Sequence, residues 1–167
     1  MLTRERLSRE DWHAVRAAPH LVLLAVSATG GGPLHRMLER HAGMRGVTDA
    51  ADSTHPLVRA LADAPEIVEA QDEIQRWLHR LADAERTAAG MQERALQGFS
   101  QALDVVAARG EAGDLQAYAQ FVLALANRVA RAAREVDGAT AGSRRVSAAE
   151  AAFIQRLEGI ATSVVRG

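Results

Sequence analysis

The acidic residues on either side of Gly138 are the strongest candidates for chemistry in this chain. Glu135 and Asp137 precede that glycine, and Glu150 follows within the next predicted helix. Carboxylates gathered at a turn are the oxygen ligands that Ca²⁺ and Mg²⁺ prefer. The sequence therefore predicts a weak divalent metal site at this joint. The alternative is structural, because Ser147-x-x-Glu150 is also the pattern of a helix capping box.

A second set of polar residues could serve a metal-dependent enzyme. His35 and Glu39 are four residues apart and would share one helix face, a spacing that can bind a metal. Acids from Glu69, Asp72 or Glu73 could complete such a site. The alternative is that these histidines and acids are ordinary surface or half-buried side chains. This hypothesis names a metal but no reaction.

Nucleophilic catalysis has little support in the sequence. The chain has no cysteine and no lysine, which removes thiolate nucleophiles, disulfides, Schiff-base chemistry and a P-loop lysine. None of its serines stands in a Gly-x-Ser-x-Gly setting. The run 30–32 of three glycines follows a predicted helix, so it indicates a helix end and not a dinucleotide loop. We therefore favour a non-enzymatic protein, with no catalytic residue assigned.

The charge balance gives no drive toward nucleic acid. The chain has 20 basic and 21 acidic residues and a formal net charge of -1. Arginines at 128, 131, 134, 144 and 145 could meet phosphates, but a solvated helix face explains them as well. The abundance of Ala and Arg is typical of a GC-rich bacterial genome. We expect no nucleic-acid partner.

Helical periodicity runs through almost the whole chain, without strand-like alternation. We predict an all-α protein, a single compact bundle of seven to eight helices that forms one domain over residues 1–167. Ser8 should cap the first helix, and Pro19 should end it or open the next, a short buried helix over 20–28. A further helix should start at Pro33, and residues 43–53 should form a loop.

The second half of the chain has the clearest helix signals. Helices should begin near Thr54 and at Pro65, and Gly90 and Gly98 argue against one continuous rod beyond them. Gly110 and Gly113 predict a break, after which Asp114 should cap a long helix. Ser147 should cap the last helix. The core stripe of these two helices is predicted at Phe121, Leu125, Val129, Ile154 and Leu157.

The joint between these two helices resembles a known family. Val136-Asp137-Gly138, followed by Ser147-Ala148-Ala149-Glu150, is similar to the joint of the tellurite-resistance TerB-like proteins. Those are small all-α bundles with two related halves, each with an Asp-Gly turn and a Ser-x-x-Glu helix start. The matching turn in the first half is Ala28-Thr29-Gly30, where Thr29 replaces the acid. The resemblance implies a stress-associated module that binds a partner protein. It also implies a Ca²⁺ or Mg²⁺ site at the second joint, at Asp137, Glu150 and Glu135, and no metal site at the first joint.

The location and partners follow from the same observations. The longest apolar run, Leu21 to Ala28, is too short to cross a bilayer, so we expect no membrane partner and a cytoplasmic location. A protein partner or a second copy of the chain is expected. The two alternatives to the TerB-like module are the metal-dependent enzyme described above and a helical scaffold that self-associates through surplus apolar surface.

Overall fold

The computed structural model describes residues 1–29, 43–81, 86–137 and 141–166, and these are almost entirely helical. The principal helices are α1 (Arg9–Thr29), α3 (Pro56–Leu61), α4 (Ala64–Arg80), α5 (Ala88–Arg109), α6 (Ala112–Asp137) and α7 (Ala141–Arg166). Residues 43–49 form a further helical segment, and Arg4–Arg6 (η1) and Ala50–Asp52 (η2) are short 3-10 helices. No strand occurs within these ranges, which confirms the predicted all-α class.

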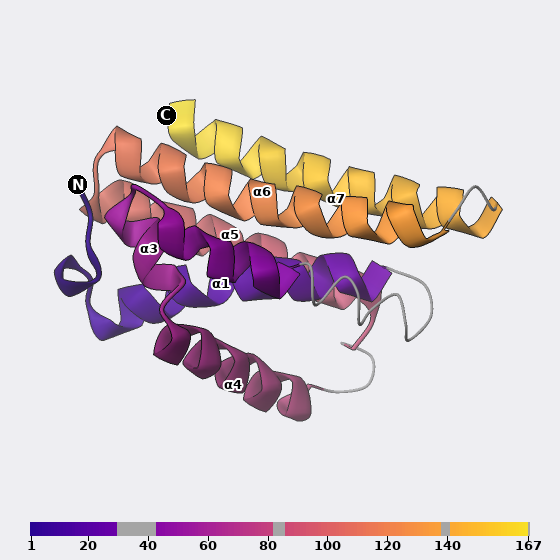
Figure 1. Cartoon of the computed structure of the whole chain (residues 1–167), viewed down its shortest axis with the longest axis horizontal. Coiled ribbons are helices and arrows are strands. Elements are labelled where there is room, and N and C mark those ends of the chain that lie inside the picture. The colour runs from indigo at the N-terminus through magenta and orange to yellow at the C-terminus, as the bar shows by residue number, and fades with distance from the viewer. Residues whose placement is uncertain (30–42, 82–85, 138–140, 167) are drawn as a thin grey trace.

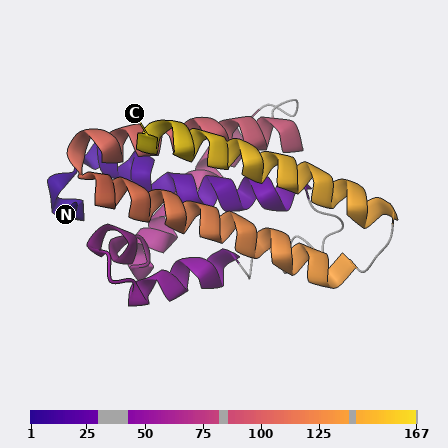
Figure 2. The same ribbon diagram turned by 90° about the horizontal axis from the view of Figure 1, so that it is seen from above.

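Helix α1 lies at the centre of the bundle. It packs against α5 over much of its length and also contacts α4, α6 and α7. Helices α6 and α7 form a long antiparallel pair, and α7 also contacts α5 (Figures 1 and 2). Helix α4 lies at the opposite edge from that pair, and packs chiefly against α1 (Figure 1). None of the described helices is long and apolar enough to cross a membrane.

The prediction that Pro19 ends a helix is wrong, because α1 continues through it to Thr29. Proline has no N–H, so the carbonyl of Val15 loses its usual partner four residues along the helix. The buried hydroxyl of Tyr118 on α6 donates a 2.8 Å hydrogen bond to that carbonyl instead. A residue 103 positions away thus makes the proline acceptable inside α1.

The predicted loop over residues 43–53 is also wrong in its first part, since residues 43–49 are helical. Gly43 and Gly46 are buried, and a Cβ atom would lie 2.7 Å from Leu23 at the first and 2.6 Å from Leu125 at the second. These glycines therefore permit the segment to approach α1 and α6 closely. In the sequence alone, glycines at these positions favour a loop. The predicted helix from Pro33 lies outside the described residues.

Several predicted boundaries shift by a few residues. Ser8 is confirmed as the first cap, because its hydroxyl accepts the N–H of Asp11 at 3.0 Å. The stretch predicted to begin at Pro65 forms two helices, α4 and α5, and Gly98 lies buried inside α5. Asp114 is the third residue of α6 and accepts the N–H of Glu111, the second half of a capping box. Ser147 is the seventh residue of α7, so the predicted cap there is wrong.

The predicted core stripe is confirmed at four of its five positions. Leu125, Val129, Ile154 and Leu157 are buried between the helices. Phe121 is half-buried and packs partly against a smaller cluster formed by Ala50, Val58 and Ala62. Its ring therefore lies at the edge of the core, next to α3. The main cluster of buried side chains draws mostly on α1, α5, α6 and α7, with further members from α3 and α4.

Candidate functional site

The largest concentration of buried charge lies between α1 and α4. Arg16 on α1 has a side chain that is only 1% exposed, although it carries a full positive charge. Its guanidinium donates to Glu66 at 2.7 Å, to Glu69, and to Glu73 at 2.8 Å. A buried charge is tolerated only when it is paired and hydrogen-bonded. The three glutamates of α4 meet that condition for Arg16.

The spacing of the glutamates places them on one side of α4. Positions 66, 69 and 73 are three and four residues apart, so they share one helix face. Pro65 and Glu66 lie in the first turn, where proline and an acidic side chain are both favoured. The helix is strongly amphipathic, and Ala70 and Ile74 are buried along an adjoining stripe. The local sequence of α4 therefore places three acidic side chains on one face of the helix, where Arg16 can contact them.

Glu66 is the most deeply buried of these acids. Besides Arg16, it accepts a 2.8 Å hydrogen bond from the indole N–H of Trp12 and a 3.0 Å ion pair from Arg4. Burial by itself would raise the pKa of Glu66, but the hydrogen bonds from Trp12 and Arg16 outweigh it and hold that pKa below its usual value. Glu66 is therefore a fixed anion at the centre of the contact between α1 and α4.

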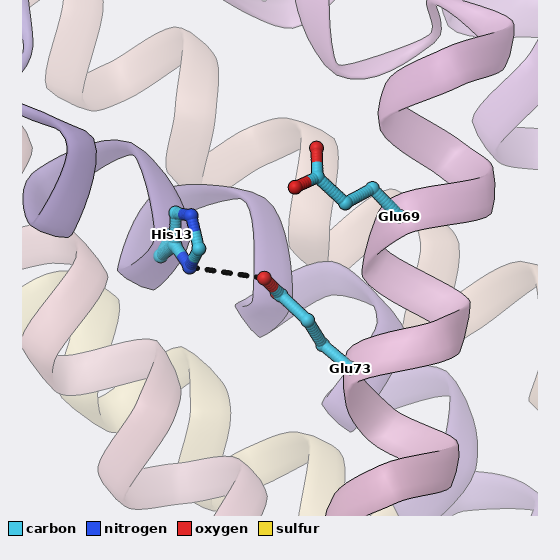
Figure 3. Close-up of side chains that lie close together, drawn as sticks. All are labelled: His13, Glu69 and Glu73. Atoms are coloured by element: carbon cyan, nitrogen blue, oxygen red, sulfur yellow. Dashed lines mark ion pairs between the residues drawn. The ribbon is translucent and has the colours of Figure 1, made fainter.

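Glu69 and Glu73 form the outer part of the same cluster, together with His13. Figure 3 shows His13 projecting from α1 toward the two glutamates of α4. The Nδ1 atom of His13 lies 2.9 Å from Glu73, and one ligand atom from each of the three residues lies within 4.8 Å of the others. One imidazole and two carboxylates are a donor set that suits Zn²⁺ or Mn²⁺ better than Ca²⁺ or Mg²⁺.

The charge balance at this cluster limits how strongly it would hold a cation. Three carboxylates face the guanidinium groups of Arg16 and Arg4, which leaves one net negative charge while His13 is neutral. Arg16 already uses Glu69 and Glu73, so a metal ion would share them with it and be repelled by it. The hydrogen bond from Arg16, followed by its charge, lowers the pKa of Glu69. The arrangement supports weak metal binding and offers no free nucleophile.

The residues predicted from the sequence as a metal site form only part of this cluster. Glu69 and Glu73 are brought together, but with His13 and not with His35 and Glu39, which lie outside the described residues. Asp72 points to another side of α4, where it lines a cavity with His20. His13 is not predicted from the sequence, because its two partners lie on another helix and the nearby Glu10 is not part of the cluster. Arg16 gave no signal, because one arginine on a helix is unremarkable without its partners.

The predicted metal site at Asp137, Glu150 and Glu135 stays a prediction. Glu150 is buried and is the tenth residue of α7, so its Cα lies about 13 Å along the helix axis from Ala141. Asp137 ends α6, and the side chains of Asp137 and Glu135 lie outside the described residues.

A second buried acid ties the amino terminus to the bundle. Asp114 accepts the N–H of Leu2 at 2.7 Å and that of Glu111 at 2.8 Å, and it lies 3.0 Å from the Nε2 atom of His55. Burial would raise its pKa, but these two backbone N–H groups hold the pKa of Asp114 below its usual value. All of its oxygens are engaged in the fold, so Asp114 has a structural role.

Comparison of the chain with models of known protein families, with curated proteins and with solved structures finds no match.

Proposed function

We propose that this protein is a non-catalytic helical module that binds a partner protein, and that α4 with its neighbouring groove makes the contact. The observation that carries the proposal is the position of α4 at the edge of the bundle, where it packs chiefly against α1 (Figure 1). Its polar side chains beside Arg16 are used within the fold. Its apolar residues Trp77 and Leu78 stay half-buried, and Val68 is 57% exposed.

The groove between α1, α4 and α5 has the features of a protein-binding surface. It has a volume of about 310 Å³ and is lined by Trp77, Arg80, Arg94 and residues of α1. Arg94 lies over the Trp77 ring, 5.9 Å from its centroid. Tryptophan and arginine are the residues that most often dominate binding energy in interfaces. Both signs of charge line the groove, since Glu10 and Glu73 face it as well.

The role implied by the TerB-like resemblance is part of this proposal. We place the protein in a stress-associated setting, with a protein partner or a second copy of the chain as the bound species. A partner helix with one apolar anchor flanked by an acid and a base would complement the groove.

The test is a site-directed comparison. The protein is crosslinked in its native cell as the parent, as Trp77→Ser and as Val165→Ser, a control at an exposed apolar position of α7. We expect one partner to be captured by the parent and by Val165→Ser but not by Trp77→Ser. Titration calorimetry with that purified partner should then show at least a tenfold loss of affinity for Trp77→Ser. Equal binding by all three proteins would contradict the proposal.

Binding of a divalent metal is a second candidate function, favoured by the distances within the cluster of His13, Glu69 and Glu73. Calorimetric titration with Zn²⁺ and Mn²⁺ should show weak binding to the parent and none to His13→Ala. His79→Ala, which changes an exposed histidine of α4, should behave as the parent. Heats that are equal in all three proteins would remove this site.

The Ca²⁺ or Mg²⁺ site implied at Asp137, Glu150 and Glu135 needs a separate titration. Weak heats with these ions that disappear in Asp137→Ala would support it. Equal heats from the parent and Asp137→Ala, or no heat from either, would leave those residues without a metal role. His13→Ala changes the contact between α1 and α4, whereas Asp137→Ala changes the end of α6. The two titrations therefore distinguish the two metal sites.

A further inference from the structure

A separate cavity lies on the other side of the contact between α1 and α4. It has a volume of about 320 Å³, enough for roughly ten water-sized groups. Volumes of this size and above are typical of small-molecule sites. Its lining is mixed. The buried polar residues His20 and Ser27 come from α1, exposed polar residues come from α4, and the apolar part is shared between them. The lining residues are His20, Leu23, Leu24, Ser27, Met44, Gln71, Asp72, Ile74, Gln75 and Leu78.

His20 is the unusual member of this lining. The residue is only 7% exposed, and no hydrogen bond joins its ring to another of the described residues. Buried polar side chains are hydrogen-bonded in the large majority of cases. The ring nitrogens of His20 are not sealed inside the protein, so they are open to a hydrogen-bonding group of a molecule in the cavity.

Ser27 reinforces this observation. It lies seven residues after His20, on the same face of α1, and lines the same cavity. It is also 7% exposed, and its hydroxyl makes no hydrogen bond with any described residue. Two buried polar residues of α1 thus line the same cavity.

The electrostatics of the cavity select an uncharged ligand. Burial, followed by the positive charge of Arg16, lowers the pKa of His20 to about 4, so its ring is neutral at pH 7. A neutral imidazole offers one N–H donor and one acceptor nitrogen. Asp72, which is exposed at the rim, disfavours an anion, and Arg16 disfavours a cation deeper in.

We propose that this cavity binds an uncharged, mainly apolar small molecule whose hydroxyl or carbonyl group hydrogen-bonds to His20. The apolar body of the ligand lies against Leu23, Leu24, Ile74 and Leu78. Ser27 is positioned to make a second hydrogen bond. The proposal is independent of the partner-binding groove, which lies between α1, α4 and α5 and does not include His20.

The experiment uses a matched pair of probes, 4-propylphenol and propylbenzene, with binding followed by NMR on labelled protein. The phenol should bind about fivefold more tightly than the hydrocarbon, as one net hydrogen bond predicts. His20→Leu should bind both probes equally, whereas the surface control His79→Leu should keep the preference. The ring-nitrogen signals of His20 should shift with the phenol only.

A second variant keeps the test decisive if His20→Leu does not fold. Leu24→Trp adds bulk to the cavity from the half-buried edge of α1 and should abolish binding of both probes. The proposal is overturned if neither probe binds the parent, if His20→Leu keeps the fivefold preference, or if Leu24→Trp binds both probes as the parent does.

Discussion

The buried hydroxyl of Tyr118 donates a 2.8 Å hydrogen bond to the backbone carbonyl of Val15. That carbonyl faces the position of Pro19, which has no N–H to offer it. The hydrogen bond therefore replaces one backbone bond of α1 and links the central helix to α6.

Tyr118→Phe should lower the free energy of unfolding by about 1–3 kcal/mol, because the Val15 carbonyl would stay buried and unpaired. In a Pro19→Ala background the new N–H at position 19 can bond to that carbonyl, so the same change should cost less. Urea denaturation of the parent, both single variants and the double variant gives the coupling. Strictly additive effects would show that the proline and the tyrosine are unrelated.

His20 should make the stability of the fold depend on pH between 6.5 and 4. Its pKa is 6.5 in an exposed chain and about 4 in the fold, so below pH 6.5 the unfolded chain takes up a proton that the folded protein does not. Stability should fall as the pH drops from 6.5 to 4, by about 3 kcal/mol in total. Urea midpoints across this range should fall less steeply for His20→Gln than for the parent; parallel curves would contradict the assignment.

Gly43 should not tolerate a side chain. A Cβ there would lie 2.7 Å from Leu23 and 3.1 Å from Val129, a stiff β-branched side chain in the core. Gly43→Ala should therefore lower the free energy of unfolding by about 1–3 kcal/mol. Gly159→Ala is the matched control, because its added Cβ would have no atom within 4 Å other than those of its chain neighbours and of the nearby backbone of α7, and alanine favours the helix. Chemical denaturation should rank Gly159→Ala at or above the parent and Gly43→Ala below it.

Arg16→Gln should be strongly destabilising, by about 3–5 kcal/mol, because Glu66 would remain buried without its main countercharge. Arg76→Gln changes an exposed arginine of α4 and should cost little. Zn²⁺ should stabilise Arg16→Gln more than the parent, since the competing guanidinium is gone. Thermal melts with and without Zn²⁺ measure this difference. Equal shifts in both proteins would show that Arg16 does not control access to the cluster.

Helical class, the Ser8 cap and the stripe that buries Leu125, Val129, Ile154 and Leu157 were determined by the sequence alone. These features depend on spacings within a few turns of one helix, which periodicity and capping chemistry report directly. The presence of Glu69 and Glu73 on one helix face could be read in the same way. The pairing of these glutamates with Arg16 and His13 could not be predicted, because those two residues lie on a helix more than fifty residues earlier.

Tertiary structure decided the features that local rules misjudged. Proline and glycine each favour a helix break, so Pro19 and Gly43 predict one. In the structure, Tyr118 hydrogen-bonds to the carbonyl that Pro19 leaves without a partner. Gly43 is needed for its small size, because it packs closely against Leu23. Likewise, His20 is buried beside a cavity because α4 packs over it, which the sequence around His20 does not indicate. Side-chain partners across a bundle depend on how the helices pack, and the helical period carries no information about which faces meet.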